Sequence, residues 1–259
     1  MKTQQTIDWR TLTLGAVMIE GLIWASLRHA SGDLPTIWAC VLGTVFMNLS
    51  FTAWHESSHQ NFSLKQGWNT AFGVLMSFAS IYPGYFARRR EHLAHHRFEA
   101  DAVRDPVYAR IQCSLWAFPF RLFLTIFDRS WLKALPANFV PMTTAQVWAD
   151  RVSNLLAFGG LALAWRLGYG ATALWVWFIP RAIVYGLHAV YICWFPHHKE
   201  GGGYQVYRII SPRSWAWWAT MGQSLHGMHH RWPSIPWHGY SQAFREQAKN
   251  LKAEGFDGI

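Results

Sequence analysis

The chain has 259 residues, of which 51% are hydrophobic, 17% aromatic and only 14% charged. Its 17 tryptophans fit the aromatic belts of membrane interfaces, so the composition indicates an integral membrane protein. The formal net charge of +9 suits nucleic acid or anionic lipid, but this many tryptophans and phenylalanines favour lipid headgroups, and we expect no nucleic acid partner. The mean hydropathy of +0.03 is low for a pure membrane bundle, so much of the chain should lie outside the bilayer.

Two apolar segments open the chain, at residues 11–27 and 34–54. The second contains no charged residue and is long enough to cross a hydrocarbon core of about 30 Å. Because only a short turn around Gly32 joins the two segments, we expect a transmembrane hairpin. His55 should then lie where the second span leaves the membrane.

A third apolar segment, residues 70–87, is interrupted by a Pro-Gly pair. A full crossing here would place His55 and His92 on opposite sides of the bilayer, where one metal site could not use both. We therefore predict a re-entrant or in-plane segment, which Arg88–Arg90 anchors to the headgroups. Further on, residues 114–127 have the pattern of an interfacial amphipathic helix.

Residues 152–166 and 171–196 predict a second transmembrane hairpin. The expected fold is all-α: one domain over residues 1–259, with four transmembrane helices in two hairpins. A cytosolic or interfacial helical cap, made by the remaining segments, carries the histidines; these segments are residues 55–151 and 197–259.

Basic residues predict the orientation of this fold. Only Arg28 and Arg166 fall in the two hairpin turns, while nearly all other lysines and arginines lie on the side of the cap. Because basic residues prefer the cytoplasmic side, the termini and the histidines should face the cytosol, most simply from the cytoplasmic membrane.

Eight of the 13 histidines stand in three short clusters with the sequences HESSH, HLAHH and HGMHH. Residues three and four positions apart share one face of a helix, so each cluster aims two or three imidazoles one way. Eight nitrogens exceed what one metal ion takes and suit two, and imidazole prefers Fe, Zn, Cu or Ni to Mg or Ca. The candidate ligands are His55, His59, His92, His95, His96, His226, His229 and His230.

Other interpretations of these clusters are open. The first cluster matches HExxH, in which two histidines bind zinc and the glutamate acts as general base of a metalloprotease. A mononuclear zinc enzyme needs only three protein ligands, which eight clustered histidines exceed. A membrane protein that binds or transports metal without catalysis is a further alternative, and ordinary surface or capping histidines are the simplest one.

The three clusters resemble the histidine boxes of the membrane fatty acid desaturase and hydroxylase superfamily, over about residues 45–240. The Asp105-Pro106 pair after the second box and the run from His229 to Pro233 in the third also resemble that pattern. The stretch Trp194-Phe195-Pro196-His197 is similar to the place where the family supplies one more ligand. The resemblance thus makes His197 the ninth nitrogen, with His188 and His198 as alternatives.

This resemblance implies two iron ions that use O₂ and two electrons to cleave an unactivated C–H bond of a lipid taken from the bilayer. No haem or iron–sulfur motif is present, so the electrons should come from a separate ferredoxin, rubredoxin or cytochrome. Carboxylates should orient the imidazoles, and the candidates near the boxes are Glu56, Glu91, Asp101 and Asp105.

Two reactions of this superfamily compete as the function. Acyl-chain desaturation is our first expectation. Carotenoid ketolation or hydroxylation is the alternative, because the chain is short for an acyl desaturase and because Trp194–His197 with the compact third box is similar to the ketolases. The first box, HESSH, departs from the ketolase pattern, which has Asp second and Met fourth.

Overall fold

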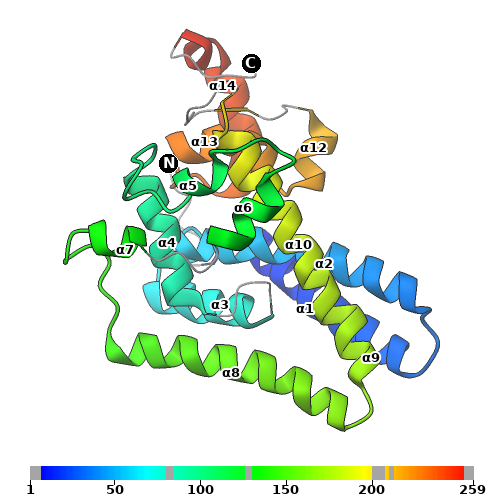
Figure 1. Cartoon of the computed structure of the whole chain (residues 1–259). Coiled ribbons are helices and arrows are strands. Elements are labelled where there is room, and N and C mark those ends of the chain that lie inside the picture. The colour runs from blue at the N-terminus through cyan, green and yellow to red at the C-terminus, as the bar shows by residue number, and fades with distance from the viewer. Residues whose placement is uncertain (1–6, 80–83, 126–129, 200–207, 210–212, 254–259) are drawn as a thin grey trace. The chain divides into compact units, whose positions relative to one another are not determined.

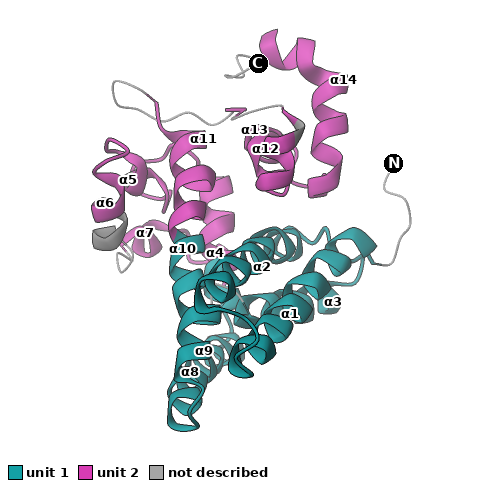
Figure 2. Ribbon diagram, turned by 90° about the vertical axis from the view of Figure 1, so that its right-hand side faces the viewer, with its two compact units in different colours: residues 1–88, 142–185 teal, residues 89–141, 186–259 magenta. Residues whose placement is uncertain are grey.

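The computed structural model describes residues 7–79, 84–125, 130–199, 208–209 and 213–253. All named elements in these ranges are helices, so the predicted all-α class is confirmed for the described part of the chain (Figure 1). The chain divides into two compact units, each made of two stretches of sequence (Figure 2). Unit 1 comprises residues 1–88 and 142–185, and unit 2 comprises residues 89–141 and 186–259. The single domain over the whole chain stays a prediction.

Unit 1 consists of long helices and the beginning of α10. In chain order these are α1 (Trp9–Ala30), α2 (Thr36–Ser58), α3 (Gln66–Ala79), α8 (Thr144–Arg166), α9 (Gly170–Thr172), the π-helical η1 (Ala173–Phe178) and α10 (Ile179–His188). The side chain of Asp8 caps α1 by accepting hydrogen bonds from the Arg10 amide and the Thr11 hydroxyl. Gly32 turns the chain into α2 at a φ of +82°, a conformation that favours glycine.

Among the described residues, three helical stretches are long and apolar enough to cross a membrane: α1, α2 and the continuous stretch Gly170–His197. They cover the predicted spans 11–27, 34–54 and 171–196. The predicted span 152–166 lies in α8, which has 23 residues but is not among these three. The four-span arrangement in two hairpins and the cytosolic cap therefore stay predictions.

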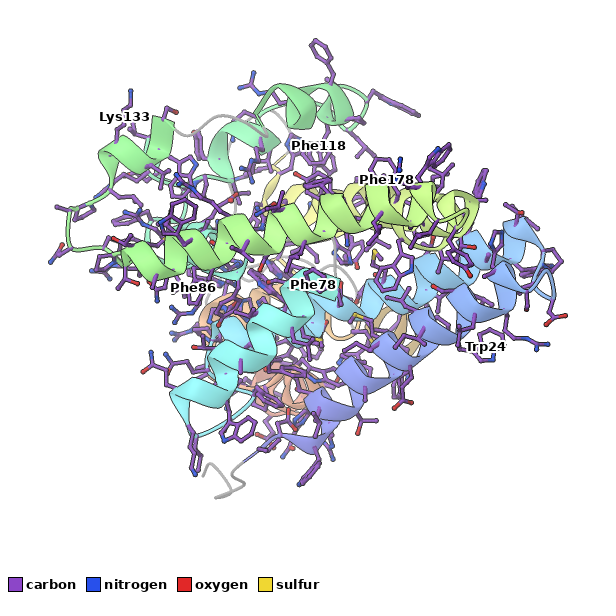
Figure 3. The ribbon with its side chains drawn as sticks, turned by 90° about the horizontal axis from the view of Figure 1, so that it is seen from below. Trp24, Phe78, Phe86, Phe118, Lys133 and Phe178 are labelled. Carbon is purple, nitrogen blue, oxygen red and sulfur yellow. The ribbon has the colours of Figure 1, made fainter. Side chains whose placement is uncertain are left out.

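The outer surface of unit 1 is apolar, as a surface facing acyl chains should be. Trp24 on α1 and Trp38 on α2 expose 49% and 57% of their area, and Phe178 exposes 47%. Trp24 is labelled in Figure 3. Large apolar side chains left exposed in this number are characteristic of a lipid-facing surface.

Close helix packing inside unit 1 depends on a glycine in α2. A Cβ atom on Gly43 would lie 2.5 Å from the carbonyl oxygen of Val176 and 2.9 Å from Cγ of Pro180. Only a residue without a side chain fits there, as at many helix contacts in membranes.

The segment predicted to enter the membrane without crossing it corresponds to α3, whose 14 residues are fewer than the roughly 20 that a full crossing takes. Residues 80–83 of this segment lie outside the described residues. Tyr85 follows, and its hydroxyl donates a hydrogen bond to the Ser57 carbonyl at 3.2 Å. The backbone N–H groups of Phe86 and Ala87 donate to Asp150 at the start of α8.

Unit 2 consists of shorter helices. In chain order these are most of α4 (Tyr85–Arg97), α5 (Tyr108–Ile111), α6 (Phe118–Thr125), α7 (Ser130–Ala134), the end of α10, the π-helical η2 (Ala189–Trp194), α11 (Phe195–His197), α12 (Ser214–Ala219), η3 (Gln223–Leu225), α13 (His226–Arg231), η4 (Trp237–Gly239) and α14 (Tyr240–Ala253). The predicted amphipathic helix 114–127 is represented by the shorter α6, with residues 126 and 127 outside the described part. One core cluster packs Ile111 and Phe118 against Trp194, whose indole N–H donates to the Cys113 carbonyl at 3.0 Å.

Candidate metal centre

Four imidazoles in unit 2 form a compact, buried set. One nitrogen from each lies within 4.8 Å of the others, and the four residues are His95, His197, His226 and His230. The Nε2 atoms of His226 and His230 are 2.8 Å apart, and those of His95 and His197 are 3.2 Å apart. We call these four residues set A.

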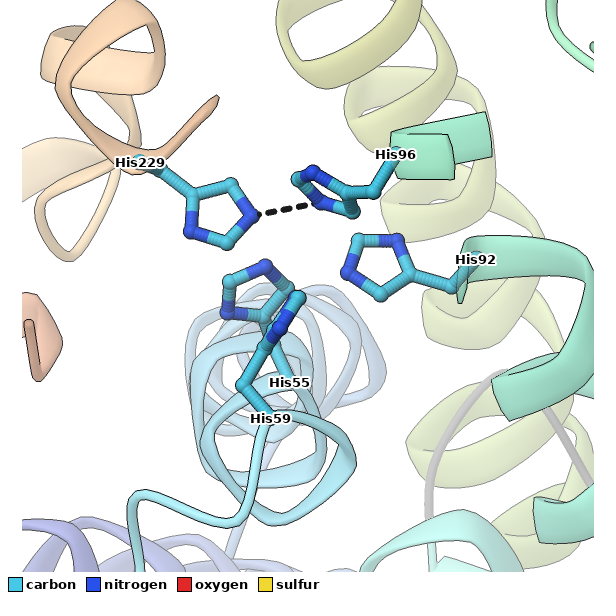
Figure 4. Close-up of side chains that lie close together, drawn as sticks. All are labelled: His55, His59, His92, His96 and His229. Atoms are coloured by element: carbon cyan, nitrogen blue, oxygen red, sulfur yellow. Dashed lines mark hydrogen bonds between the residues drawn. The ribbon is translucent and has the colours of Figure 1, made fainter. Parts of the chain in front are cut away.

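Three further imidazoles of unit 2 form a second group, which we call set B: His92, His96 and His229. One nitrogen from each lies within 4.8 Å of the other two. The Nε2 atoms of His96 and His229 are 2.8 Å apart (Figure 4). The His92 ring meets His96 edge-on, at 4.6 Å between centroids.

The two helices that carry boxes two and three divide their histidines between the sets in opposite proportions. Helix α4 gives His95 to set A and two residues, His92 and His96, to set B. Helix α13 gives His226 and His230 to set A and only His229 to set B. The division follows from helix periodicity. Two histidines four residues apart point the same way, while the histidine just before the second of them points in another direction.

The first box lies in unit 1, on the last turn of α2. The His55 and His59 rings stand 4.8 Å apart between centroids, because four residues make about one helical turn (Figure 4). Nδ1 of His55 lies 3.4 Å from the Glu56 carboxylate. The pair therefore offers two imidazoles from one helix end.

Several imidazoles of unit 2 turn Nε2 toward another imidazole and Nδ1 toward an oxygen outside the set. Nδ1 of His95 lies 3.0 Å from Asp105, and Nδ1 of His226 lies 3.1 Å from the Gln223 amide oxygen. Nδ1 of His229 lies 3.0 Å from the Tyr240 hydroxyl.

Glu99 faces one histidine of each set. Its carboxylate contacts Nδ1 of His230 and lies 3.7 Å from Nδ1 of His96. Buried carboxylates behind imidazoles are a recurrent way to fix the orientation and tautomer of metal ligands.

This arrangement fits a metal ion. When Nδ1 donates its hydrogen to an oxygen, Nε2 is the unprotonated nitrogen that a metal requires. Two such lone pairs at 2.8 Å, as in His226 and His230, repel each other unless a cation or a proton lies between them. Soft and borderline cations such as iron or zinc suit an all-imidazole site better than magnesium or calcium does.

The electrostatics around His230 keep its imidazole available to a metal ion. Burial, together with the neighbouring imidazoles, holds the pKa of His230 well below its usual value, so the ring is neutral near pH 7. Burial raises the pKa of Glu99 to about 7. Burial also acts to raise the pKa of Asp105, but His95 and the backbone N–H of Val107 outweigh it and hold that pKa below its usual value.

Two of the four predicted carboxylate partners contact a box histidine: Asp105 contacts His95 and Glu56 contacts His55. The other two pair with arginines, Glu91 with Arg110 at 2.7 Å and Asp101 with Arg104 at 2.5 Å.

Sequence reasoning missed three imidazole partners. Glu99 follows His96 by three residues and Gln223 precedes His226 by three, so the helical spacing that found the boxes could have found them. Tyr240 is eleven residues from His229 and carries no such signal.

Of the three candidates for the ninth ligand, only His197 belongs to a set. His198 stacks on Trp194 and its Nδ1 lies 3.0 Å from the Ile111 carbonyl oxygen. His188 is buried on α10, two turns before His197, and is in neither set. The assignment of all nine residues as metal ligands stays a prediction.

A family model described as fatty acid desaturase matches residues 34–256. The chain belongs to the fatty acid desaturase family. The predicted resemblance to the desaturase and hydroxylase superfamily is thereby confirmed, and with its three apolar helices this desaturase-family chain is an integral membrane protein.

A zeaxanthin 4-ketolase of Chlamydomonas reinhardtii is similar to this desaturase-family chain. The two are 28% identical over 245 residues, which cover 88% of this chain and 49% of the relative. The chain thus spans about half the length of that relative.

Proposed function

We propose that this protein is an O₂-dependent di-iron oxidoreductase that converts a ring methylene of a carotenoid into a ketone. The convergence of imidazole nitrogens in sets A and B, with oxygen partners at Nδ1 of His95, His226 and His229, is the observation that supports metal-dependent chemistry. The similarity to a zeaxanthin 4-ketolase over 88% of the chain supports the carotenoid as substrate.

The nine histidines divide into two proposed ligand groups. Set A would hold one ion with four imidazoles: His95, His197, His226 and His230. Set B has three imidazoles within unit 2, and His55 and His59 of unit 1 are the remaining two proposed iron ligands. When bound, the two irons supply the activation of O₂ and the oxidation of an unactivated C–H bond, and the protein contributes neutral nitrogen ligands held in fixed orientations.

The proposed reaction consists of two oxygenations of the same carbon. Each consumes one O₂, two electrons and two protons, replaces a C–H bond by C–OH and releases one water. The second gives a geminal diol, which loses water to leave the ketone. A separate ferredoxin, rubredoxin or cytochrome would supply the electrons, and the carotenoid would enter from the bilayer.

Acyl-chain desaturation is the second candidate, because the matching family model is that of the fatty acid desaturases. Cells that express the protein and contain β-carotene, zeaxanthin and isotopically labelled acyl lipids would separate the two. We expect ketocarotenoids to form and the acyl lipids to stay unchanged. Desaturated acyl chains without any ketocarotenoid would establish the second candidate instead.

The metal content tests the reaction class independently of the substrate. The purified protein should contain about two Fe per chain and should need O₂ for turnover. One Zn per chain with peptide cleavage would establish the metalloprotease alternative. Metal without turnover of any lipid would favour a role in metal binding or transport.

The proposed location is the cytoplasmic membrane, with the termini and the metal centre on the cytosolic side. Arg88–Arg90 would then face anionic headgroups or an acidic electron donor. Fluorescent or protease-cleavable tags at both termini would test this orientation, since both should be accessible from the cytosol.

A further inference from the structure

Unit 1 contains an apolar cavity that the proposed chemistry does not use. Its volume is about 540 Å³, within the range of small-molecule sites. Residues of α1, α3, α8, α9, η1 and α10 line it, and most of the lining is aliphatic or aromatic. Phe78 and Phe178, two of the aromatic lining residues, are labelled in Figure 3.

Two of the polar groups that line the cavity already have protein partners. The Ser26 hydroxyl accepts a hydrogen bond from the Trp177 indole N–H at 2.9 Å and donates to the Leu22 carbonyl at 2.7 Å. The Thr172 hydroxyl lies 2.8 Å from Nδ1 of His29. These two hydroxyls therefore have hydrogen-bond partners without any ligand in the cavity.

Arg181 differs from them. Its guanidinium is the only charged group among the lining residues, and its Nε atom is buried without a hydrogen-bond partner among the described residues. An ionised side chain within a membrane span is costly unless something accepts its hydrogen bonds, so such a residue marks a functional position by default. A ligand in the cavity with an oxygen acceptor would supply what Arg181 lacks.

The depth of Arg181 restricts the kind of ligand. It lies eleven residues into the helical stretch that begins at Gly170, roughly 17 Å along the axis at 1.5 Å per residue, and thus about midway through a hydrocarbon core of about 30 Å. A phospholipid phosphate would have to leave the interface to reach this depth. An oxygen carried on an otherwise apolar molecule meets no such cost.

We propose that this cavity binds an oxygen-bearing end ring of a carotenoid, whose hydroxyl or keto oxygen accepts a hydrogen bond from Arg181. The proposal rests on the proposed carotenoid substrate. It predicts that oxygenated carotenoids bind better than hydrocarbon carotenoids. The apolar lining would hold the ring itself, and Arg181 would recognise only its oxygen.

Two adjacent glycines of α8 provide a matched test. A Cβ atom at Gly159 or at Gly160 would meet nothing within 4 Å, so the helix tolerates a side chain at both positions. Only Gly160 lines the cavity. Gly160→Phe should therefore fill the cavity, while Gly159→Phe makes the same change to helix propensity outside it.

The experiment measures the carotenoid that co-purifies with each variant from cells containing either zeaxanthin or β-carotene, together with the ketone formed. Gly160→Phe should retain less than about one tenth of the wild-type zeaxanthin, and Gly159→Phe should retain all of it. Arg181→Met should lower retained zeaxanthin about tenfold while retained β-carotene changes less than twofold.

Three results would overturn the proposal. One is equal pigment in the two glycine variants, and another is an unchanged ratio of zeaxanthin to β-carotene in Arg181→Met. A fatty acid or phospholipid found in place of the carotenoid would also overturn it. If the wild type makes ketocarotenoids but the variants bind normally, only the cavity proposal fails. If Gly160→Phe and Arg181→Met lose zeaxanthin as expected but the wild type forms no ketone, only the proposed reaction fails.

Discussion

Nε2 of His226 lies 2.8 Å from Nε2 of His230, one helical turn further along α13, while Nδ1 of His226 faces the Gln223 amide oxygen. Two rings held in this way are prepared to share one cation, and the nitrogens of the other members of sets A and B also lie within 4.8 Å of one another in each set. We therefore expect that removal of one ligand from either set abolishes turnover.

His95→Ala tests set A and His229→Ala tests set B. Each should abolish turnover and lower the bound iron, with little change in the yield of folded protein. His198→Ala is the control, because this ring stacks on Trp194 and belongs to neither set. Iron content by mass spectrometry and product analysis give the readouts. Retained turnover in both set variants would refute the proposed centre.

Asp105 and Asp101 are a natural pair for testing the orientation of His95. Asp105→Asn keeps the shape of the side chain but removes the charge behind Nδ1, and it should weaken iron binding about 10- to 100-fold. Asp101→Asn removes the same charge from a carboxylate that pairs with Arg104 and should leave iron binding unchanged. Competition with a calibrated chelator measures both affinities. Equal affinities would show that Asp105 does not act through His95.

Tyr240→Phe removes the hydroxyl behind His229 from a fully buried side chain. We expect a loss of iron affinity of about 10-fold or more, since Nδ1 of His229 loses its partner. Tyr85→Phe removes a comparable buried hydroxyl, but that one bonds the backbone carbonyl of Ser57. If both variants lose the same amount of iron, the effect of Tyr240 is on stability and not on the ligand.

Gly43→Ala should destabilise unit 1. Its Cβ would lie 2.5 Å from the Val176 carbonyl oxygen, a backbone atom that cannot move aside freely. Overpacking of this kind costs about 1–3 kcal/mol. Gly67→Ala, in α3, meets nothing within 4 Å and should be neutral or slightly stabilising. Thermal unfolding in detergent compares the two, and an unchanged Tm for Gly43→Ala would contradict the close contact.

Glu99 and His230 make a specific prediction for the iron-free protein. His230 has a lowered pKa, so the unfolded state gains a proton below pH 6.5 that the folded state does not take up, and this contribution destabilises the fold as the pH falls. Glu99, with its pKa raised from 4.5 to about 7, keeps a proton in the fold that the unfolded state releases, which acts in the opposite direction between pH 4.5 and 6.5.

The two contributions should cancel in the wild type between pH 4.5 and 6.5. Glu99→Gln removes one of them, so its stability should fall on acidification by up to about 1.4 kcal/mol per pH unit. Unfolding of the iron-free proteins across this pH range measures the slopes. Parallel curves for wild type and variant would show that Glu99 does not keep an extra proton in the folded state.

The sequence predicted well the features that depend on the spacing and polarity of neighbouring residues. Helical spacing identified the three boxes, and apolar length identified α1, α2 and the stretch Gly170–His197. The span predicted to end at residue 54 continues as α2 to Ser58, because a box of helix-compatible residues follows without a breaker. Helix α8 begins eight residues before the predicted span, at a capping box of Thr143 and Gln146.

The features that the sequence did not predict depend on contacts between residues far apart in the chain. The division into two units cannot be read from composition, because each unit joins two separate stretches of chain. Of the imidazole partners, the sequence singled out Glu56 and Asp105 and missed Glu99 and Gln223, although helical spacing could have found these two. Tyr240 and His229 meet because η4 and α14 fold back, and neither residue carries a periodic signal of it.

The opposite division of α4 and α13 between the two sets makes both proposed ligand groups depend on the same two helices. His95 and His96 are consecutive residues, as are His229 and His230, yet each pair serves both sets. A shift of either helix would thus move ligands of both groups together. Occupancy should consequently be all-or-none: the first ion to arrive stiffens the helices that receive the second, and intermediate species with a single iron should be scarce in titrations.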